Sequence, residues 1–343
     1  MKTYDNFTEA YIDIAKDLCN DYEYCSSPRG MKIKEILGYQ FRLSNPRARI
    51  PFVPERKMSI HYLIAELVWY LSGNDSSAWI SKYSSFWKKI SDDGKTANSA
   101  YGARIFKPHS YHFVPGMIHN WVQWDYVKEE LKKDPDSRRA VIHIRLPQDS
   151  QRAVLDVPCT LSLQFFLRDD KVHMVTSMRS SDLIFGLTYD VPAFTIFQEL
   201  LALQLTKELD RPVGLGSYTH LSASLHVYER HFDMLQKIAD SNPVPNISNL
   251  YTMPEMPTDP PNEAFLDFEK EITSAADEGE LLGAYLQDVR QQSDLRHPYW
   301  NDWRTILVSH RAAKLGNATA AKELLGLTNY SGFRFFADME AGS

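Results

Sequence analysis

Cysteine is scarce in this chain: its 343 residues include only Cys19, Cys25 and Cys159. An odd and sparse set does not build a disulfide scaffold, and no C-x-x-C pair suggests a zinc site. We therefore expect no metal centre and a reducing compartment, which favours the cytoplasm. The first residues also lack the apolar core of a secretory signal, which agrees with that expectation.

The chain has neither a strong charge of one sign nor a long apolar run. Its formal net charge is -6, so the molecule as a whole does not attract nucleic acid, and we expect no nucleic-acid partner. An anionic substrate would need a local cluster of arginines. The apolar runs end well short of a membrane span, so no membrane association is expected. The length suits one large domain or two small ones.

Hydrophobic spacing predicts alternating helices and strands rather than repeats or low-complexity segments. Helices are expected at 7–20, 58–72, 121–132, 191–208 and 221–239. Strands are expected at 31–42 and 140–145, and a hairpin at 161–178. Six prolines between residues 241 and 262 predict a connecting segment, which two helical stretches, 263–293 and 302–326, follow.

The most informative segment runs from residue 156 to residue 190. Cys159 follows Asp-Val-Pro at the start of a predicted strand, Arg-Ser-x-Asp begins at Arg179, and Gly-Leu-x-Tyr-Asp ends at Asp190. A single cysteine between strands is more often a small buried side chain than a nucleophile. The ordered set, however, resembles the nucleotide-binding core of the thymidylate synthase family.

The resemblance covers roughly residues 7–240 and implies the α/β (α+β) thymidylate synthase fold, a large mixed sheet packed by helices. It also implies a homodimer with shared active sites that binds a pyrimidine nucleoside monophosphate. The chain then divides into a catalytic domain at 1–240, a Pro-rich connection at 241–262 and a helical C-terminal extension at 263–343. The resemblance gives that extension no role.

The resemblance also assigns the catalytic residues. Cys159 would add to C6 of a pyrimidine, and C5 would then attack the one-carbon unit of 5,10-methylenetetrahydrofolate, the expected co-substrate. A nearby Arg179 would favour the nucleophilic thiolate. Glu66 lies in a very apolar helix, so it is either a solvent-facing polar edge or a buried carboxylate with a raised pKa that handles protons at the base. Tyr101 matches a Tyr-Gly near the nucleophile. Thr160 departs from the family, which usually has His after the Cys.

The remaining residues would bind the substrate and the folate. Arginine offers a planar fork to phosphate oxygens, although an Arg-Ser pair alone more often marks a surface turn. The resemblance places Arg29, Arg179 and Ser180 at the phosphate, with Arg138 and Arg139 donated by the other chain. It places His226 and Tyr228 at the sugar, Asp182 in a mainly structural role at the substrate and folate, and Trp87 and Gly186 at the folate.

Asp190 carries the prediction of the base. Thymidylate synthases have Asn here, whose amide matches the N3–H donor and O4 acceptor of uracil. Deoxycytidylate hydroxymethylases have Asp. A carboxylate accepts from N4 of cytosine, and a proton shared with N3 completes the pair. The alternative is a helix N-cap for the turn at Val191-Pro192.

We therefore interpret the chain as a dCMP or CMP 5-hydroxymethylase. One alternative is a methylating synthase that acts on (d)CMP or dUMP, and a second is a non-catalytic relative that binds nucleotide or RNA. The family's short apolar C-terminus is missing from the final residues 338–343, which favours water as the last reactant. Trp87, which the family has on the folate side, favours methylation instead.

Overall fold

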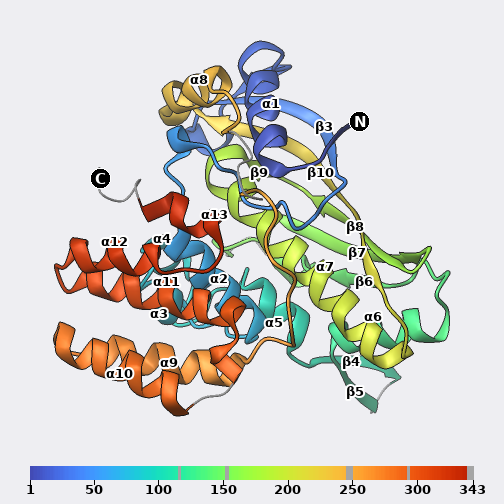
Figure 1. Cartoon of the computed structure of the whole chain (residues 1–343). Helices are drawn as coiled ribbons and strands as arrows, with labels where there is room; N and C mark the ends of the chain where they lie inside the picture. Colours follow the sequence, from blue (N-terminus) through green and yellow to red (C-terminus); the bar gives the residue numbers. More distant parts are fainter. Residues whose placement is uncertain (115–116, 151–153, 245–249, 292–293, 338–343) are drawn as a thin grey trace.

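The computed structural model describes residues 1–114, 117–150, 154–244, 250–291 and 294–337, with the backbone alone within 110–119 and 286–294 (Figure 1). A mixed sheet forms its centre, in the strand order β1-β3-β10-β8-β7-β6. These strands are β1 (Lys2–Tyr4), β3 (Ile33–Leu43), β6 (Val141–His143), β7 (Thr160–Arg168), β8 (Lys171–Met178) and β10 (Gly214–Tyr228). β2 (Tyr24–Ser26) pairs with β3, and β9 (Ser181–Asp182) with β10. The predicted fold, a large mixed sheet packed by helices, is confirmed.

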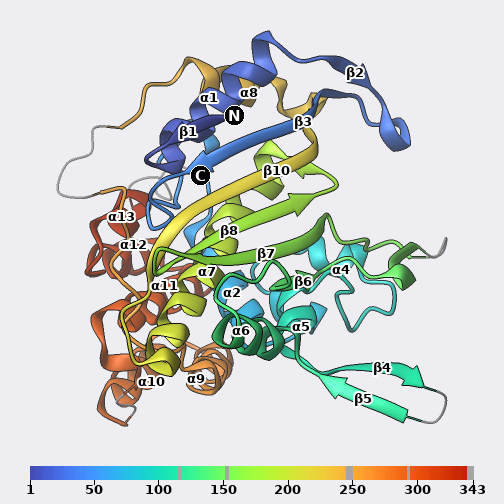
Figure 2. The same ribbon diagram turned by 90° about the vertical axis from the view of Figure 1, so that its right-hand side faces the viewer.

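Most helices lie on one side of the sheet, whereas Figure 2 looks onto its other side. The layer includes α1 (Phe7–Asn20), α2 (Ile60–Leu71) and α7 (Thr188–Leu209), with α8 (Phe232–Asp240) beside α1. Along β7, Leu163, Phe165 and Leu167 are buried, and the side chains between them are only partly covered. This alternation is expected of a sheet with one face packed on the core.

Shorter elements connect the sheet to the helices near its edge. They are α3 (Ser77–Ile80), α4 (Phe86–Ile90), α5 (Tyr101–Phe106), α6 (Gln123–Lys133) and the hairpin of β4 (His109–Val114) and β5 (Met117–Trp121). The predicted hairpin at 161–178 is present as antiparallel β7 and β8. The helix predicted at 191–208 is also present, and it begins three residues earlier, at Thr188.

The helix predicted at 221–239 was wrong over its first half. β10 continues to Tyr228, pairs with β3 on one side and with β8 and β9 on the other, and only then does α8 begin, at Phe232. Three consecutive residues of β10, from Leu225 to Val227, are buried. A central strand of this kind lacks the simple alternation by which a strand is recognised in sequence.

The C-terminal part forms a helical layer against the helices that cover the sheet (Figure 1). It consists of α9 (Asn262–Ser274), α10 (Glu278–Gln291), α11 (Pro298–Lys314), α12 (Ala318–Gly326) and α13 (Ser331–Arg334). Each predicted helical stretch is thus two helices; Gly316, with φ +89°, lies in the break after α11. α11 packs on α2, where Nε2 of His61 lies 3.0 Å from Oγ of Ser309. No helix in the described ranges has the length and apolarity needed to cross a bilayer.

Gly102 allows α5 to approach α2 closely. A Cβ atom at this position would collide with the carbonyl oxygen and Cα of Tyr70, both of which belong to the backbone. We therefore expect Gly102→Ala to lower the free energy of unfolding by about 3 kcal/mol, because the two helices would have to separate. Urea unfolding measures the change.

The matched control is Gly283→Ala in α10, where a Cβ would meet nothing within 4 Å. Because alanine restricts the unfolded chain, this variant should be neutral or more stable by roughly 0.5–1 kcal/mol. If Gly102→Ala unfolds at the same urea concentration as Gly283→Ala, the close approach of α5 to α2 is contradicted.

Candidate functional site

The β7–β8 hairpin brings Cys159 and Arg179 together. The backbone N–H of Arg179 donates to the carbonyl oxygen of Cys159 at 2.8 Å. The Arg179 guanidinium donates to the carbonyl oxygens of Pro158 and Val157, both at 2.9 Å, and its Nη2 lies 3.5 Å from Cys159 Sγ. Arg179 therefore fixes the loop in front of the cysteine as well as placing a cation beside the sulfur.

Burial decides the protonation of Cys159 in the protein without substrate. Burial raises the pKa of the Cys159 thiol, the positive charge of Arg179 lowers it, and the charges of Asp190, Asp156 and Asp182 raise it further. The net shift is upward. As expected, the charge of Arg179 favours the thiolate, but burial and the three aspartates outweigh it. The thiol is therefore protonated at neutral pH.

Glu66 is 5% exposed, on the face of α2 that points into the protein. The hydroxyl of Tyr62 donates to its Oε1 at 2.6 Å, and that of Tyr70 donates to the same oxygen at 3.3 Å. Burial raises the pKa of Glu66 to about 7, although both hydrogen bonds oppose the shift. The solvent-facing alternative for Glu66 is thereby excluded.

The two tyrosines around Glu66 were not among the predicted site residues. Trp87 Nε1 donates to the Tyr62 oxygen at 2.9 Å, so a chain of contacts runs from Trp87 through Tyr62 to Glu66. Tyr62 and Tyr70 stand four residues before and four residues after Glu66. That spacing on a predicted helix was a usable signal, because such residues share one helix face.

Asp190 and Tyr101 complete a cluster with Cys159 and Glu66. Burial raises the pKa of Asp190 well above its ordinary value, and the charges of Glu66 and Asp182 add to the shift. Tyr101 begins α5, its ring stacks on Tyr70 at 5.3 Å, and its pKa is raised by burial and by the charges of Asp190 and Cys159. These mutual effects join the four predicted catalytic side chains in one region.

The helix-cap alternative for Asp190 was wrong. α7 begins at Thr188, and Asp190 lies inside its first turn. A cap is provided one element earlier by Asp182, which accepts from the backbone N–H of Ile184 at 3.1 Å and of Phe185 at 3.4 Å. Asp182 thereby starts the turn Leu183–Leu187 that leads into α7.

The predicted sugar and folate residues border the same turn. Asp182 in β9 is the register partner of His226 in β10, and the His226 ring meets Tyr228 edge to face at 5.2 Å. Because β10 is a strand, residues two apart share a face, so His226 and Tyr228 lie on the same side of it. A Cβ at Gly186 would lie 3.3 Å from Asp190 Oδ2. Ser180 links β8 to β9.

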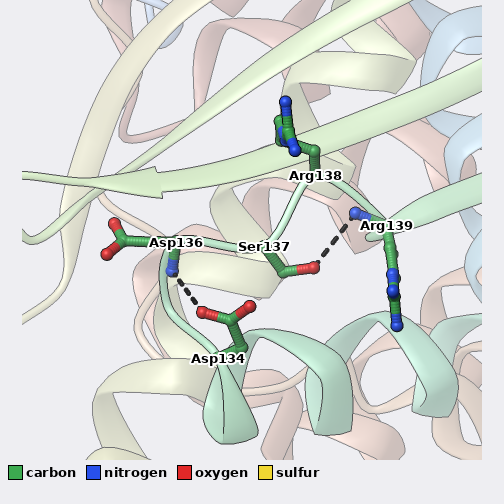
Figure 3. A pocket seen from close by; sticks show the side chains of 5 residues that line it. All are labelled: Asp134, Asp136, Ser137, Arg138 and Arg139. Carbon is green, nitrogen blue, oxygen red and sulfur yellow. Dashed lines mark hydrogen bonds between the residues drawn. The ribbon is translucent and has the colours of Figure 1, made fainter.

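The other three arginines lie apart from this cluster. Arg138 and Arg139 are exposed on the loop after α6 and line an open pocket with Asp134, Asp136 and Ser137. Figure 3 shows their side chains pointing to opposite sides of the loop. Arg29 is exposed on the turn before β3, with φ +53°. Among the described residues, no hydrogen bond or ion pair joins these arginines to Cys159, whereas Arg179 reaches its sulfur.

The sequence also predicted that two features are absent, a metal centre and the family's apolar C-terminus. Within the described parts of the chain, no group of three or more His, Cys, Asp or Glu side chains is arranged to hold a metal ion. Residues 338–343, on which the expectation of water as the last reactant rested, lie outside the described residues. That expectation stays a prediction.

Comparison with known proteins confirms the resemblance. Residues 9–269 match the family model described as thymidylate synthase. A deoxyuridylate hydroxymethyltransferase of Bacillus phage SP01 is 31% identical over 227 residues, which cover 64% of this chain and 57% of that protein. The chain thus aligns with little more than half the length of that relative. The family match extends beyond residue 240 into α9, so the predicted domain boundary stays an interpretation.

Glu66 should make stability depend on pH in a defined direction. Its pKa is about 7 in the folded chain and roughly 4.3 in an unfolded one. A group raised in this way stabilises the fold fully below its unfolded pKa, and that stabilisation is lost as the pH rises through 7. Between about pH 5 and about pH 8, the wild type should lose about 2–3 kcal/mol more unfolding free energy than Glu66→Gln. Parallel curves for the two proteins in urea unfolding would contradict the raised pKa.

Proposed function

Because the chain belongs to the thymidylate synthase family, we propose that it transfers a one-carbon unit from 5,10-methylenetetrahydrofolate to C5 of a pyrimidine nucleoside monophosphate. We propose further that the base is cytosine, in dCMP or CMP, and that water completes the reaction as a 5-hydroxymethyl group. The clustering of Cys159 with Glu66, Tyr101 and Asp190 supports catalysis rather than a silent nucleotide- or RNA-binding role.

The raised pKa of Asp190 carries the choice of base. A carboxyl group that keeps its proton can donate to N3 of cytosine while its other oxygen accepts from the N4 amino group. N3 of cytosine is a base, so a proton shared with Asp190 withdraws electrons from the ring. That makes C6 a better target for the sulfur of Cys159. In this proposal Asp190 therefore selects the base and also activates its ring toward addition of the Cys159 sulfur.

Uridylate is the second candidate, and two observations favour it. The phage relative is named for deoxyuridylate. A protonated Asp190 also lacks the negative charge that would repel O4 of uracil, so its carboxyl group does not exclude that base. Cytosine remains our first choice because its basic N3 is a stronger partner for an acidic proton than a carbonyl oxygen is.

The residues suggest an order of proton and electron movements. Cys159 passes its proton to water and its sulfur bonds to C6, which places the ring electrons at C5. The folate supplies the one-carbon unit, which becomes bonded to C5. Tyr101, which lies near Cys159 and Asp190 and keeps its own proton, is suited to hold a water that receives the proton C5 then loses. Loss of this proton breaks the bond between the one-carbon unit and the folate nitrogen, so that tetrahydrofolate leaves and an exocyclic methylene remains on C5. Water adds to the exocyclic methylene and gives a proton to Glu66, and the sulfur leaves C6 as the ring double bond returns.

The phosphate site points to a second copy of the chain. A phosphate dianion needs more cations than Arg179 alone, because Arg179 already bonds two carbonyl oxygens. Arg138 and Arg139 are exposed, and the helices in the described part of the chain leave one face of the sheet largely open, where Gln164, Phe166 and other residues are only partly covered. We propose that two copies pack through this face as a homodimer, so that each gives Arg138 and Arg139 to the other.

Asp190→Asn tests the choice of base. The amide can no longer share a proton with N3, but it pairs well with N3–H and O4 of uracil. We expect the ratio of kcat/KM for the cytidine nucleotide to that for the uridine nucleotide to fall ~10-fold or more, the effect of one mispaired buried polar group. Parallel assays with dCMP, CMP, dUMP and UMP, with products identified by mass, measure it.

Two outcomes would count against this proposal. A wild-type protein that prefers dUMP would favour the second candidate, and a methyl instead of a hydroxymethyl product would favour the methylating synthase. Asp190→Asn should still release tritium from a 5-tritiated nucleotide, because Cys159 is intact. A variant without tritium release has lost more than base selection.

The shared phosphate site predicts complementation between two inactive chains. Cys159→Ser lacks the nucleophile and Arg139→Ala lacks an arginine donated to the partner. Mixed dimers hold one site with both residues intact, so activity should return to roughly one quarter of the wild-type level when equal amounts exchange subunits at random. Mixing two batches of Cys159→Ser is the control. Demonstrated subunit exchange without recovery would refute the donated arginines.

A further inference from the structure

Tyr62 stands at a junction to which the sequence assigns no function. Its hydroxyl oxygen accepts from Trp87 Nε1 at 2.9 Å and its hydroxyl hydrogen is donated to Glu66 Oε1 at 2.6 Å. We propose that Tyr62 is a positioning residue for water addition. It fixes the Trp87 indole to one oxygen of Glu66 and leaves the other oxygen to activate the water. This inference rests on the proposed hydroxymethylation.

The hydrogen bonds of Glu66 are unevenly divided. Tyr62 and Tyr70 both donate to Oε1, and no described residue donates to Oε2. A carboxylate oxygen that already accepts two hydrogen bonds is a weaker base than its free neighbour. Proton exchange with water is therefore directed to Oε2, and the orientation of the carboxyl group is set mainly by the shorter bond, from Tyr62.

Tyr62 is held in the donor role. Burial and the negative charge of Glu66 raise the pKa of Tyr62 well above its ordinary value, so the hydroxyl keeps its proton. The ring packs edge to face against Tyr189 at 4.8 Å, in the motif that ends at Asp190. Trp87 is likewise fixed, by an edge contact of 5.0 Å with Trp69. The hydrogen bond between Trp87 and Tyr62 thus connects α4 to α2, and the ring at each end of the bond is packed against a neighbouring ring.

The chemical step that this geometry serves is balanced without a further reactant. The water O–H bond breaks, its proton moves to Glu66 Oε2, and the oxygen bonds to the exocyclic methylene of the nucleotide. The electron pair of the methylene double bond moves into the ring and then returns to expel the sulfur of Cys159. In the family, Trp87 favours methylation. Here its indole is held by Tyr62, and in our proposal Trp87 in this position allows water to add.

Tyr62→Phe tests the proposal and Tyr70→Phe is the matched control. Both variants remove a hydroxyl that bonds Glu66 Oε1 from the same helix, but only Tyr62 also bonds Trp87. The carboxyl infrared band of Glu66, identified by its loss in Glu66→Gln, gives the Glu66 pKa without any substrate. We expect Tyr62→Phe to raise this pKa by about one pH unit or more, and Tyr70→Phe to raise it less, since its bond is longer.

The kinetic readout separates positioning from structural support. Tyr62→Phe should lower kcat for hydroxymethylation ~10-fold or more, leave KM for the nucleotide within ~2-fold and keep tritium release from C5. Tyr70→Phe should keep kcat within ~3-fold. Equal effects of the two variants on kcat, or no pKa shift in Tyr62→Phe, would overturn the role of Tyr62. A wild type that forms no hydroxymethyl product refutes the proposed function and the role in water addition. The infrared titration then separately decides whether Tyr62 controls Glu66.

Discussion

The pairing of β7 with β8 is the interaction on which the site depends. It places Arg179, at the end of β8, beside Cys159, at the start of β7, and one backbone hydrogen bond of 2.8 Å joins them. The Arg179 side chain then holds the carbonyls that precede the cysteine. β9 and the turn capped by Asp182 follow directly. They determine where α7 begins and therefore where Asp190 lies. A shift of this register by one residue would turn these side chains to the other face of the sheet.

Burial of acidic groups gives the site its chemical character. Glu66 and Asp190 both have pKa values raised chiefly by burial, and the charge of Glu66 further disfavours the ionisation of Asp190, because like charges in a buried region repel. Cys159 is protonated in the same surroundings. Burial therefore disfavours the charged form of all three groups. The side chains that we propose supply further positive charge at the phosphate are exposed. They are Arg29, Arg138 and Arg139.

Much of this arrangement was predictable from sequence, for reasons that are local. The hairpin at 161–178 alternates between buried and partly covered residues over most of its length, α2 and α7 are long and mostly apolar, and the order of motifs identified the family. The last part of β10, residues 221–228, was predicted as helix because consecutive residues there are buried. The role of Tyr62 depends on Trp87 in another element, a contact that spacing along one helix does not reveal. The phosphate site could not be completed either, because the proposal draws part of it from a second chain.

The most direct test of the account is to identify the source of the oxygen in the product. The purified protein, methylenetetrahydrofolate and a cytidine monophosphate would react in water enriched in heavy oxygen, and the nucleotide would be analysed by mass spectrometry. Water addition to the methylene predicts a 5-hydroxymethyl nucleotide that carries the heavy oxygen on its new carbon. A 5-methyl nucleotide without that oxygen, or an unchanged substrate, would contradict the account.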